Sequence, residues 1–92
     1  MKLVIRRKAV DDLDRIYDWI AEGSAVAALR VARALRRRMH EVLLPELVDI
    51  GRPGRRKGTR ELIEGSYIVV YKVDRRRGVV TVLAVFHGAQ ER

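Results

Sequence analysis

Three kinds of hydrophobic pattern follow one another along the chain and predict its secondary structure. Residues 2–6 (KLVIR) form a short apolar run, which is typical of a strand that must pair with others. From Ala9 onward, apolar residues recur every three or four positions, as they do on one face of an amphipathic helix. After residue 58 the chain returns to short runs rich in β-branched residues. The pattern therefore predicts one strand, a helical region and then several strands.

The helical region divides into two helices at Gly23 and Ser24. Gly23 is predicted to stop the first helix, which starts near Ala9. Ser24 is predicted to cap the second helix, which runs to about Leu44 and is ended by Pro45. Because the joint between the helices is so short, we expect them to pack as an antiparallel hairpin.

Two residues depart from the apolar pattern of the helices. Trp19 lies about 140° from the centre of the first helix's apolar arc, so it either packs against the second helix or stays exposed as an anchor for a protein partner. Arg36 falls inside the apolar arc of the second helix. A charge there needs a partner, and an aspartate of the neighbouring helix is the expected one.

The second half of the chain predicts a three-stranded antiparallel meander. Strands are expected at 59–64, 67–73 and 79–86, with turns at 65–66 and 74–78. The last two strands are apolar on both faces, and one helical hairpin covers only one face of a sheet. The other face is therefore expected to bind a partner. The predicted fold is α+β in the order β-α-α-β-β-β, with the helices on one sheet face and residues 1–92 in a single domain.

Positive charge is concentrated in the second half of the chain. The net charge is +8, and residues 51–92 hold ten Lys or Arg against four Asp or Glu. Segment 49–58 is expected to be an irregular loop, because its glycines and proline interrupt regular structure. Its charges either contact an anionic partner, such as nucleic acid or an acidic protein surface, or form a solvated connector. The candidate target-binding or nucleic-acid-binding residues are Arg52, Arg55, Arg56, Lys57 and Arg60.

Residues with catalytic chemistry are sparse. The chain has no cysteine, which excludes disulfides and cysteine-ligated zinc, and we expect neither a metal nor another cofactor. His87, at the end of the last predicted strand, is either a general acid or base or a structural residue. No apolar run is long enough to cross a membrane and no signal peptide is evident, so we expect a soluble cytoplasmic protein.

The segments GRPGRRKGTREL, SYIVVYKV and VTVLAVFHGAQ, placed after one strand and two helices, resemble the RelE/ParE superfamily of bacterial type II toxin–antitoxin toxins. The resemblance covers essentially the whole chain. It implies a compact toxin in a hetero-oligomer with a ParD-like or other antitoxin, an extended or helical segment of which wraps the toxin. We expect antitoxin contacts at Trp19, Ile68 and Val70.

Members of this superfamily differ in mechanism. RelE-like members cut mRNA on the ribosome, with basic side chains on the sheet and a residue near the C-terminus, whereas ParE-like members inhibit DNA gyrase. Ile68 stands where the nucleases carry an arginine, and Thr59 and Glu61 stand where RelE carries lysines. RNA cleavage needs cations to stabilise the transition state and a base to activate the 2′-hydroxyl. The resemblance therefore favours a ParE-like gyrase inhibitor.

Two alternatives stay open. In a ribosome-dependent endonuclease, His87 would act together with Arg60 or Arg55. In a plain RNA-binding module without a toxin role, aromatic residues on the open sheet face would stack against bases. The chain has one Trp, three Tyr and one Phe, so few aromatic side chains are present for the base stacking that the second alternative requires.

Overall fold

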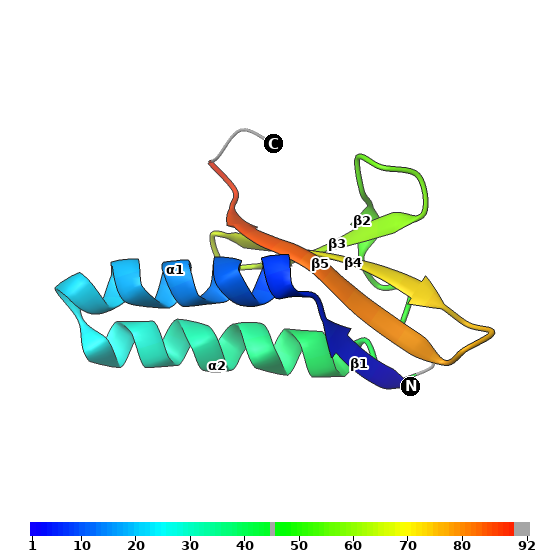
Figure 1. Ribbon diagram of the computed structural model, residues 1–92, viewed down its shortest axis with the longest axis horizontal. Helices are drawn as coiled ribbons and strands as arrows, with labels where there is room; N and C mark the ends of the chain where they lie inside the picture. The colour runs from blue at the N-terminus through cyan, green and yellow to red at the C-terminus, as the bar shows by residue number, and fades with distance from the viewer. Residues whose placement is uncertain (45, 90–92) are drawn as a thin grey trace.

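The computed structural model describes residues 1–44 and 46–89, and it places two helices on one side of a five-stranded sheet (Figure 1). The elements in chain order are β1 (Lys2–Ile5), α1 (Arg7–Gly23), α2 (Ala25–Glu41), β2 (Arg52–Pro53), β3 (Thr59–Glu64), β4 (Tyr67–Asp74) and β5 (Val79–His87). The predicted α+β order, with an antiparallel helical hairpin followed by a meander, is confirmed.

The sheet is mixed and has the strand order β1-β5-β4-β3-β2. β3, β4 and β5 form the antiparallel meander, and β1 adds to β5 in parallel. The two meander turns contain Gly65 (φ 57°) and Gly78 (φ 65°), left-handed conformations that glycine adopts without steric cost. The parallel pairing ends at Ile5 and Val82, so β1 covers only the first part of the outer edge of β5.

Segment 49–58 is not wholly irregular. Arg52 and Pro53 form the short strand β2, which pairs with Glu61 and Arg60 of β3. The expectation that glycine and proline exclude regular structure there is wrong for these two residues. Proline is tolerated because β2 is the edge strand, where a missing N–H donor interrupts no ladder on the outer side.

The joint between the helices lies one residue later than the pattern predicts. Gly23 is still helical, and the break is at Ser24, whose backbone is extended with φ −162°. The predicted N-cap is confirmed, because the Ser24 hydroxyl accepts a hydrogen bond from the Ala27 N–H at 3.1 Å. α2 ends at Glu41, earlier than predicted, and Pro45 lies outside the described residues.

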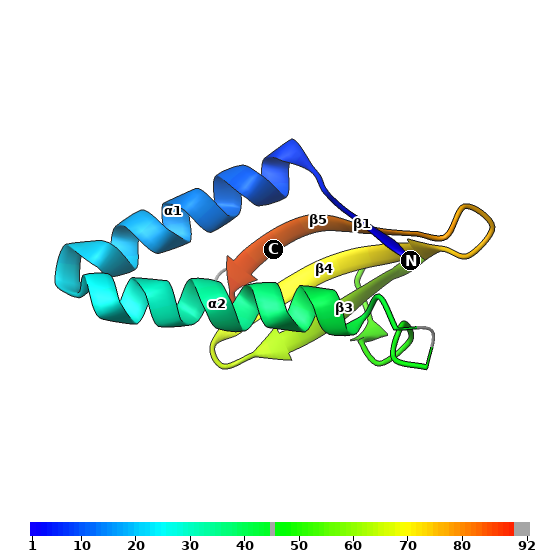
Figure 2. The same cartoon turned by 90° about the horizontal axis from the view of Figure 1, so that it is seen from below.

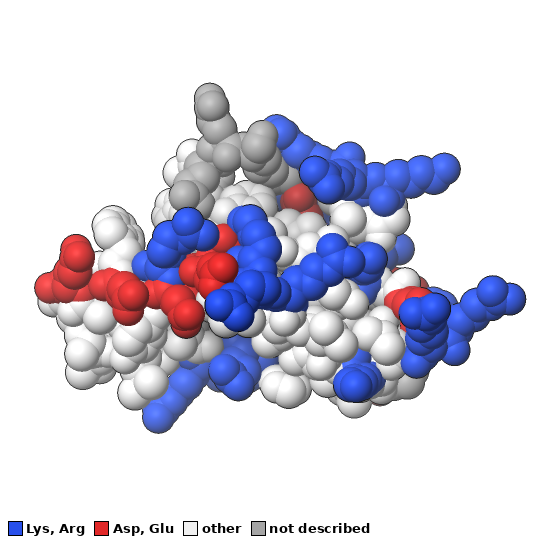
Figure 3. All heavy atoms as spheres, viewed as in Figure 1, with Lys and Arg blue, Asp and Glu red and all other residues white. Residues whose placement is uncertain are grey.

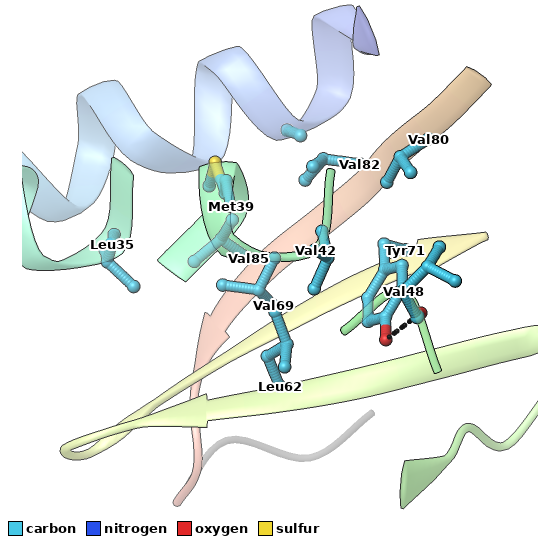
Figure 4. Close-up of a cluster of buried hydrophobic side chains, with 11 residues drawn as sticks. Leu35, Met39, Val42, Val48, Leu62, Val69, Tyr71, Val80, Val82 and Val85 are labelled. Carbon is cyan, nitrogen blue, oxygen red and sulfur yellow. Dashed lines mark hydrogen bonds between the residues drawn. The ribbon is translucent and has the colours of Figure 1, made fainter. Parts of the chain in front are cut away.

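The core lies between the helices and the facing side of the sheet (Figure 4). A register shift lets Val70 pair with Ala84 and Tyr71 with Val82, so one extra residue stands in β5. This bulge turns both Val82 and Val85 toward the core, where a regular strand would place them on opposite faces. The buried cluster consists of Ala9, Leu35, Met39, Val42, Val48, Leu62, Val69, Tyr71, Val80, Val82 and Val85.

Asp12 is a buried carboxylate on α1 that contacts the outer edge of β5. It accepts a hydrogen bond from the Val85 N–H at 3.0 Å, at a position that β1 does not reach. Lys8 and Arg15 form ion pairs with the same carboxylate, at 2.7 Å and 3.0 Å. The side chain therefore replaces a missing strand and joins α1 to the sheet.

The tip of the helical hairpin extends past the sheet (Figures 1 and 2). Trp19 lies near this tip and is 70% exposed, so packing against the second helix, one of the two alternatives for this residue, is wrong. Arg36 is exposed and, within the described residues, forms no ion pair with a helical aspartate.

Candidate functional site

The sheet face that points away from the helices has an apolar centre. Ile68 and Val70 of β4 point to this face, because the alternate residues Val69 and Tyr71 belong to the core. Their partners on β5 are Phe86 and Ala84. Ile68 is only 5% exposed, so these neighbours already cover much of the surface expected to meet a partner.

The Arg52 side chain is engaged with a carboxylate on the same face. Its guanidinium contacts the Glu61 Oε1 atom through Nη2 at 3.0 Å and through Nε at 3.1 Å. Glu61 is 4% exposed, and a buried carboxylate needs such a partner to offset its lost hydration. This pair therefore ties β2 to β3 and leaves Arg52 less available to an anionic ligand.

Arg60 is likewise engaged in holding the chain that leads into β2. Its Nη1 donates to the Gly51 carbonyl at 2.8 Å, and its Nε lies 3.4 Å from an Asp49 carboxylate oxygen. Asp49 also pairs with Arg75 from the β4–β5 turn. A single carboxylate thus brings together one guanidinium group from β3 and one from the β4–β5 turn.

His87 packs edge-to-face on Tyr67, with ring centroids 5.4 Å apart. Its Nδ1 accepts a hydrogen bond from the Ala89 N–H at 3.1 Å. This ring nitrogen is therefore engaged by the chain's own backbone two residues further on.

The structure does not bring His87 and Arg60 together. His87 pairs with Tyr67 and Arg60 pairs with Tyr71, four residues further along β4. At about 3.3 Å per residue the two positions are roughly 13 Å apart along the sheet. A base and a transition-state cation that act on one phosphodiester must both reach it, and the register places these two residues at separate points of the sheet.

Cations gather instead at the end of the sheet where the β2–β3 loop meets the β4–β5 turn; the right side of Figure 3 shows them. We call residues 49–61 and 72–77 the basic end. It contains an open hollow of about 720 Å³. The lining residues are Asp49, Pro53, Gly58, Thr59, Arg60, Lys72, Val73, Asp74, Arg75 and Arg76.

The predicted cations only partly coincide with this hollow. Arg60 lines it, whereas Arg55, Arg56 and Lys57 are exposed on the adjacent loop. Lys72, Arg75 and Arg76 are additional to the predicted set. The run of three arginines at 75–77 is the signal in the sequence for the two arginines, and Lys72 stands outside that run. Their convergence depends on the register of β4 with β3, which composition does not specify.

A second, smaller hollow of about 150 Å³ lies between the two helices. It is mostly apolar, with Asp14 and Arg36 as its charged residues. Tyr17 borders it and is 38% exposed. The full lining is Leu13, Asp14, Ile16, Tyr17, Ala28, Val31, Ala32, Leu35 and Arg36.

The antitoxin-contact candidates do not form one patch. Trp19 lies in the helix layer, whereas Ile68 and Val70 lie on the opposite sheet face. Across residues 1–44 and 46–89, no group of three or more His, Asp or Glu side chains has the arrangement of a metal site. None of the described helices has the length and apolar character needed to cross a membrane.

Comparison with known proteins identifies the family. The family model for the ParE toxin of the type II toxin-antitoxin system, parDE, matches residues 3–92. A Sinorhizobium fredii protein named as a candidate toxin, Y4kP, is 35% identical over 86 residues, which cover 91% of this chain and 84% of that protein.

Solved structures share the fold. The chromosomal ParDE system of Pseudomonas aeruginosa matches with a TM-score of 0.81 and 24% identity over 95% of both chains. The Mycobacterium tuberculosis RelBE2 complex matches with a TM-score of 0.69 and 24% identity, over 94% of this chain and 95% of that chain. The isolated Escherichia coli RelE toxin matches with a TM-score of 0.70 and 18% identity, over 98% of this chain and 86% of that chain. Together with the sequence matches, this likeness shows that the chain belongs to the family of ParE toxins of type II toxin–antitoxin systems.

Proposed function

We propose that this toxin acts by binding DNA gyrase and does not cleave RNA. The observation that carries the proposal is that the centre of the open sheet face offers no cation: Ile68, which is largely buried there, pairs with Phe86. RNA cleavage requires a phosphate to sit among cations in the transition state. An isoleucine and a phenylalanine stabilise no such charge, so the centre of this face does not support RNA cleavage.

The same conclusion is supported by the contacts of Arg52, a candidate target-binding residue, and of the candidate catalytic residues Arg60 and His87. Arg52 and Arg60 neutralise Glu61 and Asp49 and hold β2 against the sheet. A move of Arg52 away from the buried Glu61 carboxylate, or of Arg60 away from the Gly51 carbonyl and Asp49, gives up these contacts, which opposes binding of either guanidinium to a phosphate. His87 uses its acceptor nitrogen within its own segment.

A supercoiling assay with purified components tests the proposal. Toxin in excess over gyrase is expected to stop the conversion of relaxed plasmid to the supercoiled form. The same toxin is expected to leave mRNA intact on translating ribosomes. Full gyrase activity at excess toxin, combined with cut transcripts, overturns the proposal.

Substitution of the histidine separates the two mechanisms further. His87→Ala is expected to leave gyrase inhibition and toxicity unchanged, because the imidazole has no chemical role in a binding mechanism. His40→Ala, an exposed position on α2, is the matched control for loss of a histidine. Loss of toxicity in His87→Ala alone, at unchanged stability, supports the ribosome-dependent endonuclease instead.

We also propose that an antitoxin neutralises the toxin and contacts the helical hairpin. The solved relatives from P. aeruginosa and M. tuberculosis are components of toxin–antitoxin systems. The apolar hollow between α1 and α2 lies beside Arg36, and the exposed Arg33 and Arg37 follow on α2. An amphipathic antitoxin segment with acidic residues on one flank complements this surface.

A further inference from the structure

We propose that the basic end binds the phosphate backbone of duplex DNA, without reading its sequence. This inference goes beyond gyrase binding and does not depend on it, because it concerns a direct contact between the toxin and nucleic acid. The hollow between the β2–β3 loop and the β4–β5 turn is the proposed place of contact.

The charge of the basic end is strongly one-sided. Residues 49–61 and 72–77 contain nine Lys or Arg and three Asp or Glu. Each acid already holds a cation: Asp49 contacts Arg60 and Arg75, Glu61 contacts Arg52, and Asp74 contacts Arg77. The carboxylates therefore fix the positions of some cations, and a large positive excess remains.

Some of these cations line the hollow and, among the described residues, form no ion pair with a carboxylate. Within the described chain, neither Lys72 nor Arg76 forms an ion pair, and both line the hollow. Arg56 and Lys57, on the loop opposite, are exposed and likewise form no ion pair among the described residues. Such cations gain by meeting phosphates, because the condensed counterions of DNA are released.

The lining of the hollow distinguishes nucleic acid from a protein partner. Pro53 and Val73 are its only apolar residues among those described, and none of its described residues is aromatic. Protein interfaces have apolar, aromatic cores, whereas protein–DNA interfaces are polar and positively charged. The tip of the helical hairpin lies at the opposite end of the molecule (Figure 1), and the exposed Trp19 belongs to the last turns of α1, which lead to that tip.

The same lining favours a duplex over a single strand. Single-stranded nucleic acids bind through stacking of unpaired bases on aromatic side chains, which the hollow does not offer. A duplex presents its phosphates outward and needs only cations and hydrogen-bond donors. Thr59, at the start of β3, adds a polar side chain to the lining.

Fluorescence anisotropy with a short labelled duplex DNA of mixed sequence tests the proposal. The double variant Lys72→Glu/Arg76→Glu is compared with Arg33→Glu/Arg37→Glu on the outer face of α2. Both variants change the net charge by the same amount, and all four side chains are exposed and without an ion pair in the described chain. Circular dichroism melts confirm that both variants are folded.

We expect the Lys72/Arg76 variant to bind the duplex at least about tenfold more weakly than the wild type. In a plot of the logarithm of the association constant against the logarithm of the salt concentration, its slope should be smaller in magnitude by roughly two. The Arg33/Arg37 variant should retain most of its affinity. Equal losses in both variants, or no binding by the wild type at low salt, overturn the proposal. Tighter binding to single-stranded RNA than to the duplex, or displacement of the duplex by an equal charge of polyglutamate, overturns it as well.

Discussion

The hydroxyl of Tyr71 accepts a hydrogen bond from the backbone N–H of Gly51 at 3.0 Å, inside the core. The same hydroxyl donates to the Val48 carbonyl at 3.0 Å, the contact drawn in Figure 4. One buried phenol thereby satisfies two backbone groups of the segment that leads into β2. Because Asp49 lies in this segment and pairs with Arg60 and Arg75, the core side chain also positions the basic end.

Tyr71→Phe is expected to destabilise the protein by about 1–3 kcal/mol, since it leaves the Gly51 N–H and the Val48 carbonyl buried without their partner. Urea denaturation measures the loss. Tyr17→Phe is the matched control: Tyr17 is partly exposed on α1, and its change should stay below about 0.5 kcal/mol. Similar losses in both variants contradict the tethering role of the Tyr71 hydroxyl.

The same hydroxyl predicts a loss of stability at high pH. Burial raises the pKa of Tyr71 above its ordinary value of 10.0. The unfolded chain therefore releases this proton first, so the stabilising contribution is complete below pH 10 and falls as pH rises above it. Denaturation midpoints measured on the alkaline side should fall more steeply for the wild type than for Tyr71→Phe. Parallel curves are incompatible with this assignment.

Gly51→Ala is expected to destabilise the fold by about 1–3 kcal/mol through overpacking. A Cβ atom at this position would lie 2.7 Å from the Tyr71 hydroxyl and 2.9 Å from the Glu61 carbonyl. Gly23→Ala is the opposite case, because the helical Gly23 has nothing within 4 Å of its added Cβ. That variant should be more stable than the wild type by about 0.5–1 kcal/mol. Thermal melts of the two variants measure the expected loss for Gly51→Ala and the expected gain for Gly23→Ala.

Asp12→Ala is expected to cost about 1–3 kcal/mol, because it removes the acceptor for the buried Val85 N–H at the end of the parallel pairing. Asp11→Ala removes the neighbouring carboxylate, whose pair with Arg7 is exposed and worth about 0–1 kcal/mol. Hydrogen exchange at the Val85 amide gives a local readout. If that amide keeps its protection in Asp12→Ala, the edge contact is not the cause of the loss.

Trp19 is the chain's one tryptophan, so its fluorescence reports directly on the hairpin tip. Its exposed ring should emit like tryptophan in water, and binding of an antitoxin without tryptophan should shift the emission to shorter wavelength. Trp19→Ala should weaken the complex by at least about 2 kcal/mol, as a central aromatic anchor does, and leave the stability of the free toxin unchanged. The exposed Val26 supplies the control in Val26→Ala. An unshifted emission in a saturated complex places the contact elsewhere.

Local pattern alone was sufficient for the order of the elements other than β2. The 3.6-residue period of the two helices, the Ser24 cap and the glycines of the two meander turns are all encoded within a few residues of where they act. The family could be recognised for the same reason, because its motifs lie on consecutive strands and turns of one meander.

Contacts between distant segments were decided by the tertiary structure. The local pattern offered two alternatives for Trp19, packing against the second helix or exposure, and the tertiary structure decided for exposure at 70%. β2 forms because Glu61 and Arg60 offer an edge to Arg52 and Pro53. The basic end exists because Asp49 joins cations from β3 and from the β4–β5 turn. The sequence by itself determined which charges the chain carries, and only the register of the sheet and the Tyr71–Gly51 contact decided that they converge on one hollow.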